Sequence, residues 1–262
     1  MAVQMNFKRR EVKYLITDEQ RERLMQLFAQ HMVADEWGAS TVCNVYYDTP
    51  NQLLIRRSLD KPEYKEKIRV RSYGPAKPGR PVFLELKKKY DGIVYKRRCS
   101  ASLLEVDAFF DGSHAPASPI EREIDFAIRR YEGIFPYVYL AYDREAFYGA
   151  HDHDFRVTFD RNIRFRTERV SLSEGTDGEQ ILPAGMSLME VKAADAIPQW
   201  MVDFMSSEGI RRTSFSKYGR AYQMMHARGE VAFPAVQPQR VTQPVVLPLP
   251  QRSLRPAYAR AS

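Results

Sequence analysis

The chain has 262 residues, a hydrophobic fraction of 44%, a charged fraction of 28% and a formal net charge of +7. This length allows one large domain or two small ones, and the hydrophobic content is sufficient for a folded core. The basic excess is compatible with nucleic acid, phosphate-rich ligands or an anionic membrane surface. The two cysteines, Cys43 and Cys99, exclude a disulfide framework and a cysteine-based metal site, and they favour a reducing compartment.

Targeting and membrane-spanning segments are not visible in the sequence. The residues that follow Lys8, Arg9 and Arg10 contain no apolar run, so we expect no signal peptide. No stretch approaches the roughly 20 apolar residues that span a bilayer. We therefore expect a soluble, cytoplasmic protein with no transmembrane segment.

Segments of alternating apolar and polar residues, separated by turns, predict an antiparallel sheet. In chain order, the predicted strands cover residues 7–15, 41–48, 64–73, 82–89, 93–100, 137–147, 155–165 and 187–193. The Asp91-Gly92 pair predicts a tight hairpin between the fourth and fifth of these strands, because a type I′ turn needs positive φ at both positions.

Helices are predicted between these strands from their capping residues. Thr17 and Gln20 form a capping box before apolar residues at helical spacing. Ser102 opens a short helix that ends near Phe110, and Ser118 with Pro119 opens another that Gly133 can close. The last two predicted helices cover residues 198–209 and 214–228.

The composition changes near residue 230. Six prolines fall within residues 230–262, arginine is the only basic residue type there, and no acidic residue follows Glu230. This composition predicts a folded domain over residues 1–229 and a disordered, basic, proline-rich tail over residues 230–262. The tail is either a passive linker or a contact for a membrane or protein partner.

One predicted strand carries a row of four cations. Lys65, Lys67, Arg69 and Arg71 occupy alternate positions, so they share one face of the strand, opposite Ile68 and Val70. Four like charges repel one another unless an anion or a carboxylate lies opposite. The row therefore indicates a surface for a polyanionic ligand.

Charged residues alternate in the same way on other predicted strands. They are Arg9, Glu11 and Lys13; Glu85 and Lys87; Lys96 and Arg98; Arg144; Arg156 and Asp160; and Glu190 and Lys192. If these strands form one closed barrel, their apolar faces pack outward against the helices and their charged faces line a lumen. A dry lumen would make so many charges unstable, whereas a hydrated tunnel that holds polyphosphate removes the difficulty. The alternative is an ordinary sheet with one solvated basic face.

The carboxylates of this set suit a second task. Phosphoryl transfer uses a divalent ion, and oxygen ligands suit Mg²⁺ or Mn²⁺. Glu190 is our first candidate ligand, because it lies in the middle of a predicted strand beside Lys192. Glu11, Glu85 and Asp160 are further candidates, and each is also interpretable as an ion-pair partner of a neighbouring cation.

The motifs that carry these residues resemble the VTC domain, the catalytic domain of the vacuolar transporter chaperone polyphosphate polymerases, within the triphosphate tunnel (CYTH-like) superfamily. The resemblance runs from about Phe7 to Met225. The motifs are R-R-E-V-K-Y-L, Y-Y-D-T-P, K-E-K-I-R-V-R-S-Y, V-F-L-E-L-K-K-K, V-Y-K-R-R, S-L-M-E-V-K and S-F-S-K-Y-G-R. The resemblance implies an α+β fold with a closed antiparallel β-barrel, a charged lumen and flanking helices.

The resemblance also implies an activity and a site. The activity is transfer of the terminal phosphoryl group of ATP to a growing polyphosphate chain, with Mn²⁺ or Mg²⁺. The catalytic residues matched by motif are Arg69, Arg71, Lys87, Arg144 and Arg156. The matched phosphate-binding residues are Lys13 and Lys217, joined by Tyr142 and Ser216, and the metal-binding glutamate falls on Glu190. Lys65, Lys67, Arg98 and Lys192 extend the basic surface around them.

One departure from the wider superfamily favours the polymerase branch. Hydrolytic and cyclase members open with E-x-E-x-K, whereas Arg9 occupies the first acidic position here. Two alternatives stay open: a triphosphate or polyphosphate hydrolase that uses the same tunnel, and a non-catalytic polyphosphate-binding module. Nucleic acid is not an expected partner, because few aromatic residues are interleaved with the cations.

Two short motifs have other interpretations. Lys89-Tyr90-Asp91-Gly92 matches the K-x-D-G nucleophile motif of covalent nucleotidyltransferases, but the hairpin turn also explains it, and Val94 replaces the usual arginine. The His151–Asp154 segment is either a metal site or a solvated loop between two strands.

Overall fold

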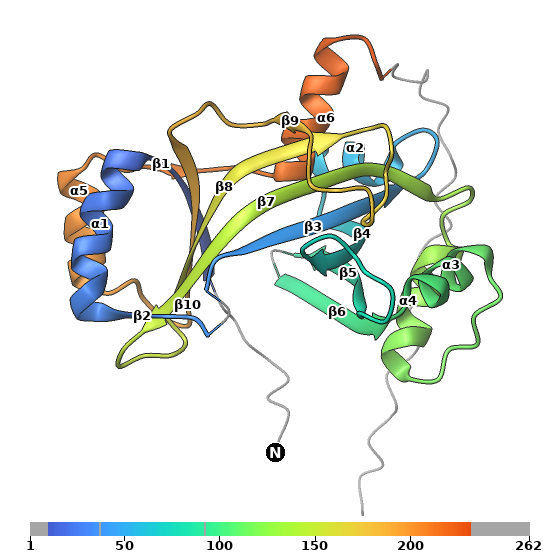
Figure 1. Cartoon of the computed structure of the whole chain (residues 1–262), viewed down its shortest axis with the longest axis horizontal. Helices are drawn as coiled ribbons and strands as arrows, with labels where there is room; N and C mark the ends of the chain where they lie inside the picture. The colour runs from blue at the N-terminus through green and yellow to red at the C-terminus, as the bar shows by residue number, and fades with distance from the viewer. Residues whose placement is uncertain (1–9, 37, 92, 232–262) are drawn as a thin grey trace, which may run out of the picture. The chain divides into compact units, whose positions relative to one another are not determined.

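The computed structural model describes residues 10–36, 38–91 and 93–231. In this part of the chain, eleven strands and six helices alternate in an α+β arrangement (Figure 1). The strands are β1 (Arg10–Thr17), β2 (Met32–Ala34), β3 (Ser40–Asp48), β4 (Tyr64–Tyr73), β5 (Val82–Tyr90), β6 (Ile93–Ala101), β7 (Phe135–Gly149), β8 (Arg156–Arg166), β9 (Glu179–Gln180), β10 (Met186–Ala193) and β11 (Arg212–Thr213). The helices are α1 (Asp18–His31), α2 (Leu53–Asp60), α3 (Leu103–Asp111), α4 (Pro119–Arg129), α5 (Gln199–Ser207) and α6 (Lys217–Ala227).

All the strands belong to one antiparallel sheet. Its order is β11-β1-β10-β8-β7-β3-β4-β5-β6, with β2 paired to β7 and β9 paired to β8. This confirms the antiparallel sheet with flanking helices. Over the described residues, however, no pairing joins β6 to β11, so the sheet is open and the predicted closure of the barrel is not seen.

The sheet is strongly curled. Five strand steps separate β1 from β4 in the sheet order, which would place them about 24 Å apart in a flat sheet. Yet Lys13 on β1 donates to the carbonyl of Phe215 at 3.1 Å, and Lys67 on β4 donates to Oγ of the next residue, Ser216, at 3.1 Å. Side chains from distant strands therefore meet at the start of α6 on one face of the sheet.

The two faces of the sheet have different partners. On one face, Val45, Ile68 and Leu84 pack with the residues of α3 and α4, and Phe159 and Val191 pack with α1 and α5. This agrees with the prediction that apolar strand faces pack against helices. The charged side chains of the predicted site lie on the opposite face, as the cross-strand register shows.

Helix α6 departs from that simple division. Tyr218 stacks on Tyr46 with ring centroids 4.6 Å apart, and Tyr46 is the cross-strand partner of Arg69. Because opposed residues share a face, α6 covers part of the charged face. Ile55 of α2 belongs to the same apolar cluster.

The predicted capping box at the start of α1 is confirmed, because Thr17 Oγ1 accepts from the Gln20 amide and Gln20 Oε1 accepts from the Thr17 amide. Helix α2 was not predicted, since the side chain of its N-cap residue, Gln52, makes no cap. Instead, Thr49 Oγ1 accepts from the Leu53 amide at 3.0 Å, and the buried Asp48 carboxylate accepts from the amides of Leu54 and Ile55 at 2.9 Å each. Strands β2, β9 and β11 were also missed, because two or three residues give no periodicity.

Two predicted helix limits were wrong. Helix α4 ends at Arg129 rather than at Gly133, which lies in the following turn with φ of 66°. Helix α6 begins at Lys217, because Ser216 is its N-cap residue and accepts from the Gly219 amide.

The β5–β6 hairpin is confirmed by the pairing of Tyr90 with Ile93, and Asp91 has the positive φ of 44° that the turn requires. Gly92, Arg9 and the tail beyond residue 231 lie outside the described residues. Within the described ranges, no helix is both long and apolar enough to cross a membrane.

Candidate functional site

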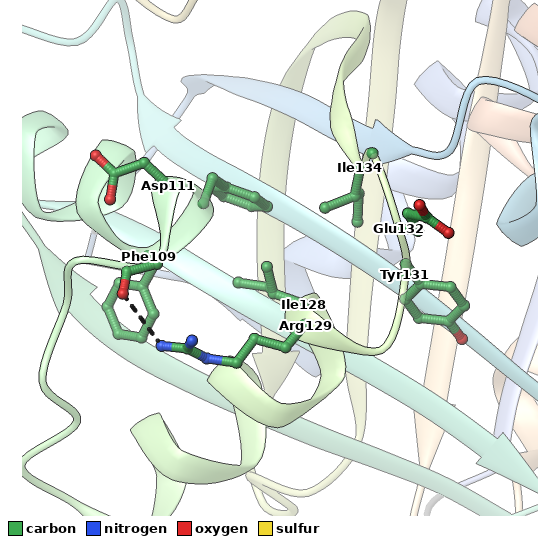
Figure 2. A pocket seen from close by; sticks show the side chains of 10 residues that line it. Phe109, Asp111, Ile128, Arg129, Tyr131, Glu132 and Ile134 are labelled. Carbon is green, nitrogen blue, oxygen red and sulfur yellow. Dashed lines mark hydrogen bonds between the residues drawn. The ribbon is translucent and has the colours of Figure 1, made fainter.

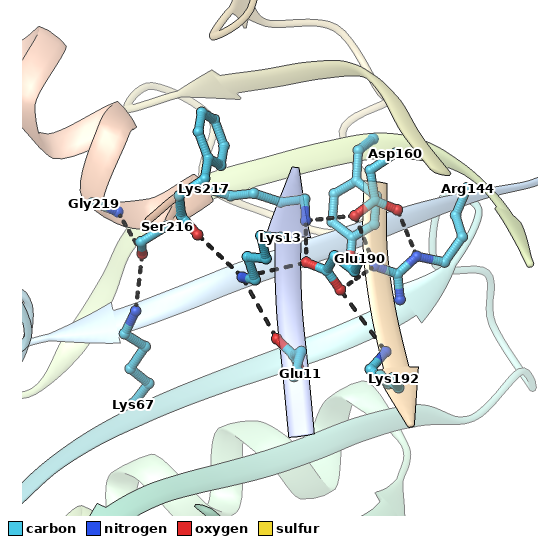
Figure 3. A network of polar contacts seen from close by, with 12 residues as sticks. Glu11, Lys13, Lys67, Arg144, Asp160, Glu190, Lys192, Ser216, Lys217 and Gly219 are labelled. Carbon is cyan, nitrogen blue, oxygen red and sulfur yellow. Dashed lines mark hydrogen bonds and ion pairs between the residues drawn. The ribbon is translucent and has the colours of Figure 1, made fainter. Parts of the chain in front are cut away.

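Two buried carboxylates form the centre of the charged face. Glu190 lies on β10, and its Oε1 atom is 3.1 Å from Lys217 Nζ and 3.3 Å from Lys13 Nζ (Figure 3). Asp160 on β8 receives Nε and Nη2 of Arg144 at 2.6 and 2.7 Å and lies 2.5 Å from Lys217 Nζ. Arg144 also reaches Glu190 at 3.4 Å, so the five side chains form one connected network.

Strand register brings these five residues together from distant parts of the sequence. Lys13 lies opposite Glu190 across β1 and β10, and Arg144 lies opposite Asp160 across β7 and β8. Lys217 is the first residue of α6. The helix therefore presents both a cation and the positive end of its dipole to the two carboxylates.

The electrostatics of this network favour full ionisation. Burial alone would raise the pKa of Glu190, but Lys217, Lys13 and Arg144 outweigh burial and hold the pKa well below its ordinary value. The pKa of Asp160 is likewise lowered by Lys217 and Arg144 against the effect of burial. Burial opposes the charge of Lys217, yet Asp160 and Glu190 raise its pKa.

Lys192 adds a further cation beside this network, 3.9 Å from Glu190 Oε2. Burial lowers the pKa of Lys192, although Glu190 opposes the shift. Four cations (Lys13, Arg144, Lys192 and Lys217) thus surround two carboxylates, which leaves this part of the site positive.

A second cluster is built around Glu85 on β5, whose side chain is only 1% exposed. It contacts Arg69 at 2.7 Å, Lys96 at 2.9 Å and Arg98 at 2.5 Å. Burial would raise the pKa of Glu85, but Arg69, Arg71 and Lys96 hold it far below its ordinary value. Burial lowers the pKa of Lys96 to about 8.

Lys96 lies opposite Lys87 across the hairpin. It was predicted as part of the alternating charged face, from its alternation with Arg98, but not as a phosphate-binding residue. Asn44 was missed, since a single amide in an apolar strand carries no charge pattern.

Asn44 and Tyr142 hold Arg71 between the two clusters. Arg71 Nε donates to Asn44 Oδ1 at 2.9 Å, and Arg71 Nη2 donates to the Tyr142 hydroxyl at 3.1 Å. The ring of Tyr142 faces the Arg144 guanidinium at 5.1 Å and Lys217 Nζ at 4.6 Å. Tyr142 therefore contacts three of the predicted phosphate-binding cations.

Lys67 connects β4 to α6 through its bond to Ser216. Burial lowers the pKa of Lys67 to about 8, and the neighbouring cations Lys87, Lys13 and Lys65 add to this shift while Tyr46 opposes it. A fraction of the Lys67 side chains is therefore uncharged at mildly alkaline pH in the free protein. A bound anion would favour its charged form.

The remaining predicted residues lie toward the margins of this face. Lys65 donates to the Ser58 carbonyl at 3.0 Å, and Lys87 is exposed. Arg156 is exposed, lies opposite Lys192 in the sheet and is 3.9 Å from Asp35. Glu11 is exposed and lies 3.7 Å from Lys13.

The carboxylates differ in how well they suit a divalent ion. Glu85 and Asp160 are almost completely enclosed by cations, so they fit ion pairing rather than metal binding. Glu190 keeps longer contacts of 3.1 to 3.9 Å, and Glu11 lies on the other side of Lys13. In the described ranges no three His, Cys, Asp or Glu side chains gather. Glu190 and Glu11 are oxygen donors of the kind that suit an ion such as Mg²⁺, which takes one or two carboxylates and completes its shell with phosphate oxygens and water, but Lys13 and Lys217 contact Glu190 Oε1 here.

Two other features carry no comparable chemistry. A hollow of about 420 Å³ lies between α3, α4 and the segment 131–134, lined by Phe109, Ile128 and Ile134 (Figure 2). None of the predicted site residues lines it. His151, Asp152 and His153 are exposed, and no metal-binding group forms around them in the described chain.

Comparison with known proteins identifies one family. The model of the VTC domain matches residues 8–226. A comparison with curated proteins gives no match.

Solved structures that match this chain share little sequence with it. A candidate adenylate cyclase from Bacillus halodurans has a TM-score of 0.48 at 13% identity, covering 79% of this chain and 92% of its own. One from Vibrio parahaemolyticus has a TM-score of 0.48 at 11% identity, covering 84% and 99%. An adenylyl cyclase candidate from Hippeastrum, described as having a dominant triphosphatase activity, has a TM-score of 0.49 at 13% identity, covering 84% and 95%.

Proposed function

Because this chain belongs to the VTC domain family, we propose that it is a polyphosphate polymerase, which transfers the terminal phosphoryl group of ATP to a growing polyphosphate chain. The observation that carries the proposal is the convergence of cations from β1, β4, β7, β10 and α6 on one face of the curled sheet. In the proposed complex the phosphates lie along this concave face, which acts as the lumen of a tunnel.

The charge balance of this face supports a polyanionic substrate. The described cations of the two clusters and their surroundings outnumber Glu11, Glu85, Asp160 and Glu190, and two of these cations, Arg71 and Lys217, are buried. Each phosphoryl oxygen that replaces water there accepts charge-assisted hydrogen bonds from Lys or Arg. A neutral ligand would leave these cations uncompensated.

The proposed roles follow from the geometry. Arg69 and Arg71 hold phosphates from the β4 side, and Arg144, Lys13 and Lys217 hold them from the opposite side. Their carboxylate and amide partners fix the side chains before the substrate binds, so little reorganisation is needed as charge develops in the transition state. Lys87 and Arg156, which are exposed, contact the ends of the bound chain.

The reaction itself requires little covalent chemistry from the protein. The attacking group is a phosphate oxygen that is already anionic, so no strong general base is needed. In-line positioning of donor and acceptor and stabilisation of the charge on the transferred group account for catalysis. When bound, a Mn²⁺ or Mg²⁺ ion held by Glu190, with Glu11 beside it, would offset charge on the phosphate oxygens.

The decisive experiment incubates the purified chain with ATP and Mn²⁺ or Mg²⁺ and resolves the products on a gel that separates polyphosphate by length. We expect long chains from the wild type and a loss of at least a hundredfold in rate for Arg69→Ala and Glu190→Ala. Arg169→Ala is the matched control, because Arg169 forms an exposed ion pair with Asp177 outside the network.

Two other results of this experiment would support the alternative functions. Release of free phosphate without chain growth would replace the polymerase with a triphosphate or polyphosphate hydrolase. Binding of ATP and polyphosphate without turnover would leave a binding module.

A further inference from the structure

The tip of the β5–β6 hairpin exposes four large hydrophobic side chains. Tyr90 is 51% exposed, Ile93 45%, Val94 49% and Tyr95 39%. They flank the turn and form a continuous apolar stretch in the sequence apart from Asp91 and Gly92. Single exposed hydrophobic residues are ordinary, whereas a group of four around one turn marks an interaction site.

The strand register places apolar side chains on both faces of this tip. Tyr90 pairs with Ile93, and Tyr95 lies two residues further along the same face of β6. Val94 pairs with Lys89 and therefore faces the other side. Strand β6 is the last strand of the sheet in the described chain, so no neighbouring strand covers its outer edge.

The lysines around this tip are crowded and have few acidic neighbours. Lys65 lies opposite Lys89 across β4 and β5, Lys67 lies opposite Lys87, and Lys89 lies opposite Val94 across β5 and β6. Burial lowers the pKa of Lys65, and the positive charges of Lys89, Lys61 and Lys87 add to this shift. The acids nearest the turn are Glu63 and Asp91, and on the other face of the hairpin Lys88 and Arg97 pair with Glu123. The positive border of the apolar tip therefore lies on the face that carries Val94 and Lys89.

We propose that the β5–β6 tip docks on the surface of a lipid bilayer that contains anionic headgroups. Ile93 and Val94 insert into the interface, Tyr90 and Tyr95 lie at the headgroup level, and Lys61 and Lys89 contact the headgroups. Tyrosine side chains favour this interface, and each lysine near an anionic surface strengthens attachment about fivefold. Apolar side chains combined with a basic border distinguish a membrane from either feature alone.

Other occupants fit the tip less well. A second copy of the hairpin would bring two lysine clusters together, and their like charges would repel. Residues 231–262 contain arginines and no acidic residue, so the lysines of the tip would repel this segment as well. A polyphosphate chain matches the lysines but gains nothing from Ile93 or Val94. This proposal does not depend on the polymerase activity.

The test is cosedimentation of the full chain with vesicles of phosphatidylcholine alone and of phosphatidylcholine with 30% phosphatidylserine. We expect binding to the anionic vesicles that falls at least tenfold in Ile93→Ser/Val94→Ser and more than tenfold in Lys61→Asn/Lys89→Gln. Leu104→Ser/Phe126→Ser is the control, because these residues of α3 and α4 are 81% and 67% exposed but lie beside Glu105 and Asp125. It should bind like the wild type.

A second measurement locates the contact. Val94→Trp should show a blue-shifted emission, relative to the wild-type background, when anionic vesicles are added. Equal binding of the tip variants and the wild type would overturn the proposal and assign attachment to another part of the chain. The proposal would also be overturned if the wild type did not bind vesicles, or if the variants lost binding only because they melt at a lower temperature. A complex with an acidic protein that depends on the tip, formed in place of lipid binding, would overturn it as well. Polyphosphate synthesis should be unchanged in Ile93→Ser/Val94→Ser, so this failure and that of the proposed activity are distinguishable.

Discussion

Asp160→Asn should destabilise the protein by about 3 kcal/mol. Asp160 is completely buried, and it receives Arg144 at 2.6 and 2.7 Å and Lys217 at 2.5 Å. Removing one member of a buried ion pair costs about 3–5 kcal/mol, because the partner keeps an uncompensated charge. The lower end applies here, since Glu190 still contacts both cations at 3.4 and 3.1 Å.

The measurement is thermal and urea unfolding of the wild type and the variant at pH 7. A loss of about 3 kcal/mol corresponds to a fall in Tm of about 6–12 °C for a domain of this size. Asp177→Asn is the control, because that carboxylate is 57% exposed and solvent screens its ion pair with Arg169.

The pH dependence gives an independent check. The folded-state pKa of Asp160 is lower than the ordinary value of 3.8, so the unfolded chain binds more protons as the pH falls. Its contribution is therefore complete above the ordinary pKa and is lost as the pH falls through the folded-state value. The acid limb of the stability curve should be shallower in Asp160→Asn. Equal stability of Asp160→Asn and Asp177→Asn would refute the buried network.

Three further outcomes are expected. Glu85→Gln leaves three cations around a neutral side chain, so it should lower the Tm of the free protein. Added tripolyphosphate should then raise the Tm of the variant by more than it raises the Tm of the wild type. An equal rise in both proteins would contradict the binding of the anion by these cations. The pKa of Lys67 is lowered to about 8 in the free protein, so tripolyphosphate binding at pH 8 should be accompanied by proton uptake. Calorimetry in buffers of different ionisation enthalpy measures this uptake, and Lys67→Met should reduce it. Asp48→Asn should lower the free energy of unfolding in urea by about 2–3 kcal/mol, because it removes the carboxylate that accepts hydrogen bonds from two amides of α2 and from the Tyr218 hydroxyl. A decrease below about 1 kcal/mol would show that other groups are sufficient to cap α2.

Much of the fold could be predicted from local patterns. Strand β4 was predicted at its observed limits of Tyr64 and Tyr73, because alternation and turn residues mark it at both ends. The capping box of α1 was predicted for the same local reason. Helix α2 could not be predicted, because its cap is supplied by Asp48, which belongs to the preceding strand.

The candidate site shows the same division. The sequence predicts that Arg69 and Arg71 share a face, because the period of a strand is two residues. It does not predict that Arg69 pairs with Glu85 whereas Arg71 contacts Asn44 and Tyr142. Those partners depend on strand register, which is set by pairing between segments far apart in the chain.

The row of alternating cations determines by itself that this protein has a basic face suited to a polyanion, since like charges on one strand face require a counter-charge. Only the tertiary structure decides which carboxylates are already neutralised by ion pairs. The curl of the sheet brings β1 and β4 to the same end of α6, so that Lys217 contacts Glu190 and Asp160 while Ser216 holds Lys67. Curvature accumulates from strand twist over the whole sheet, and no local pattern in the sequence specifies it.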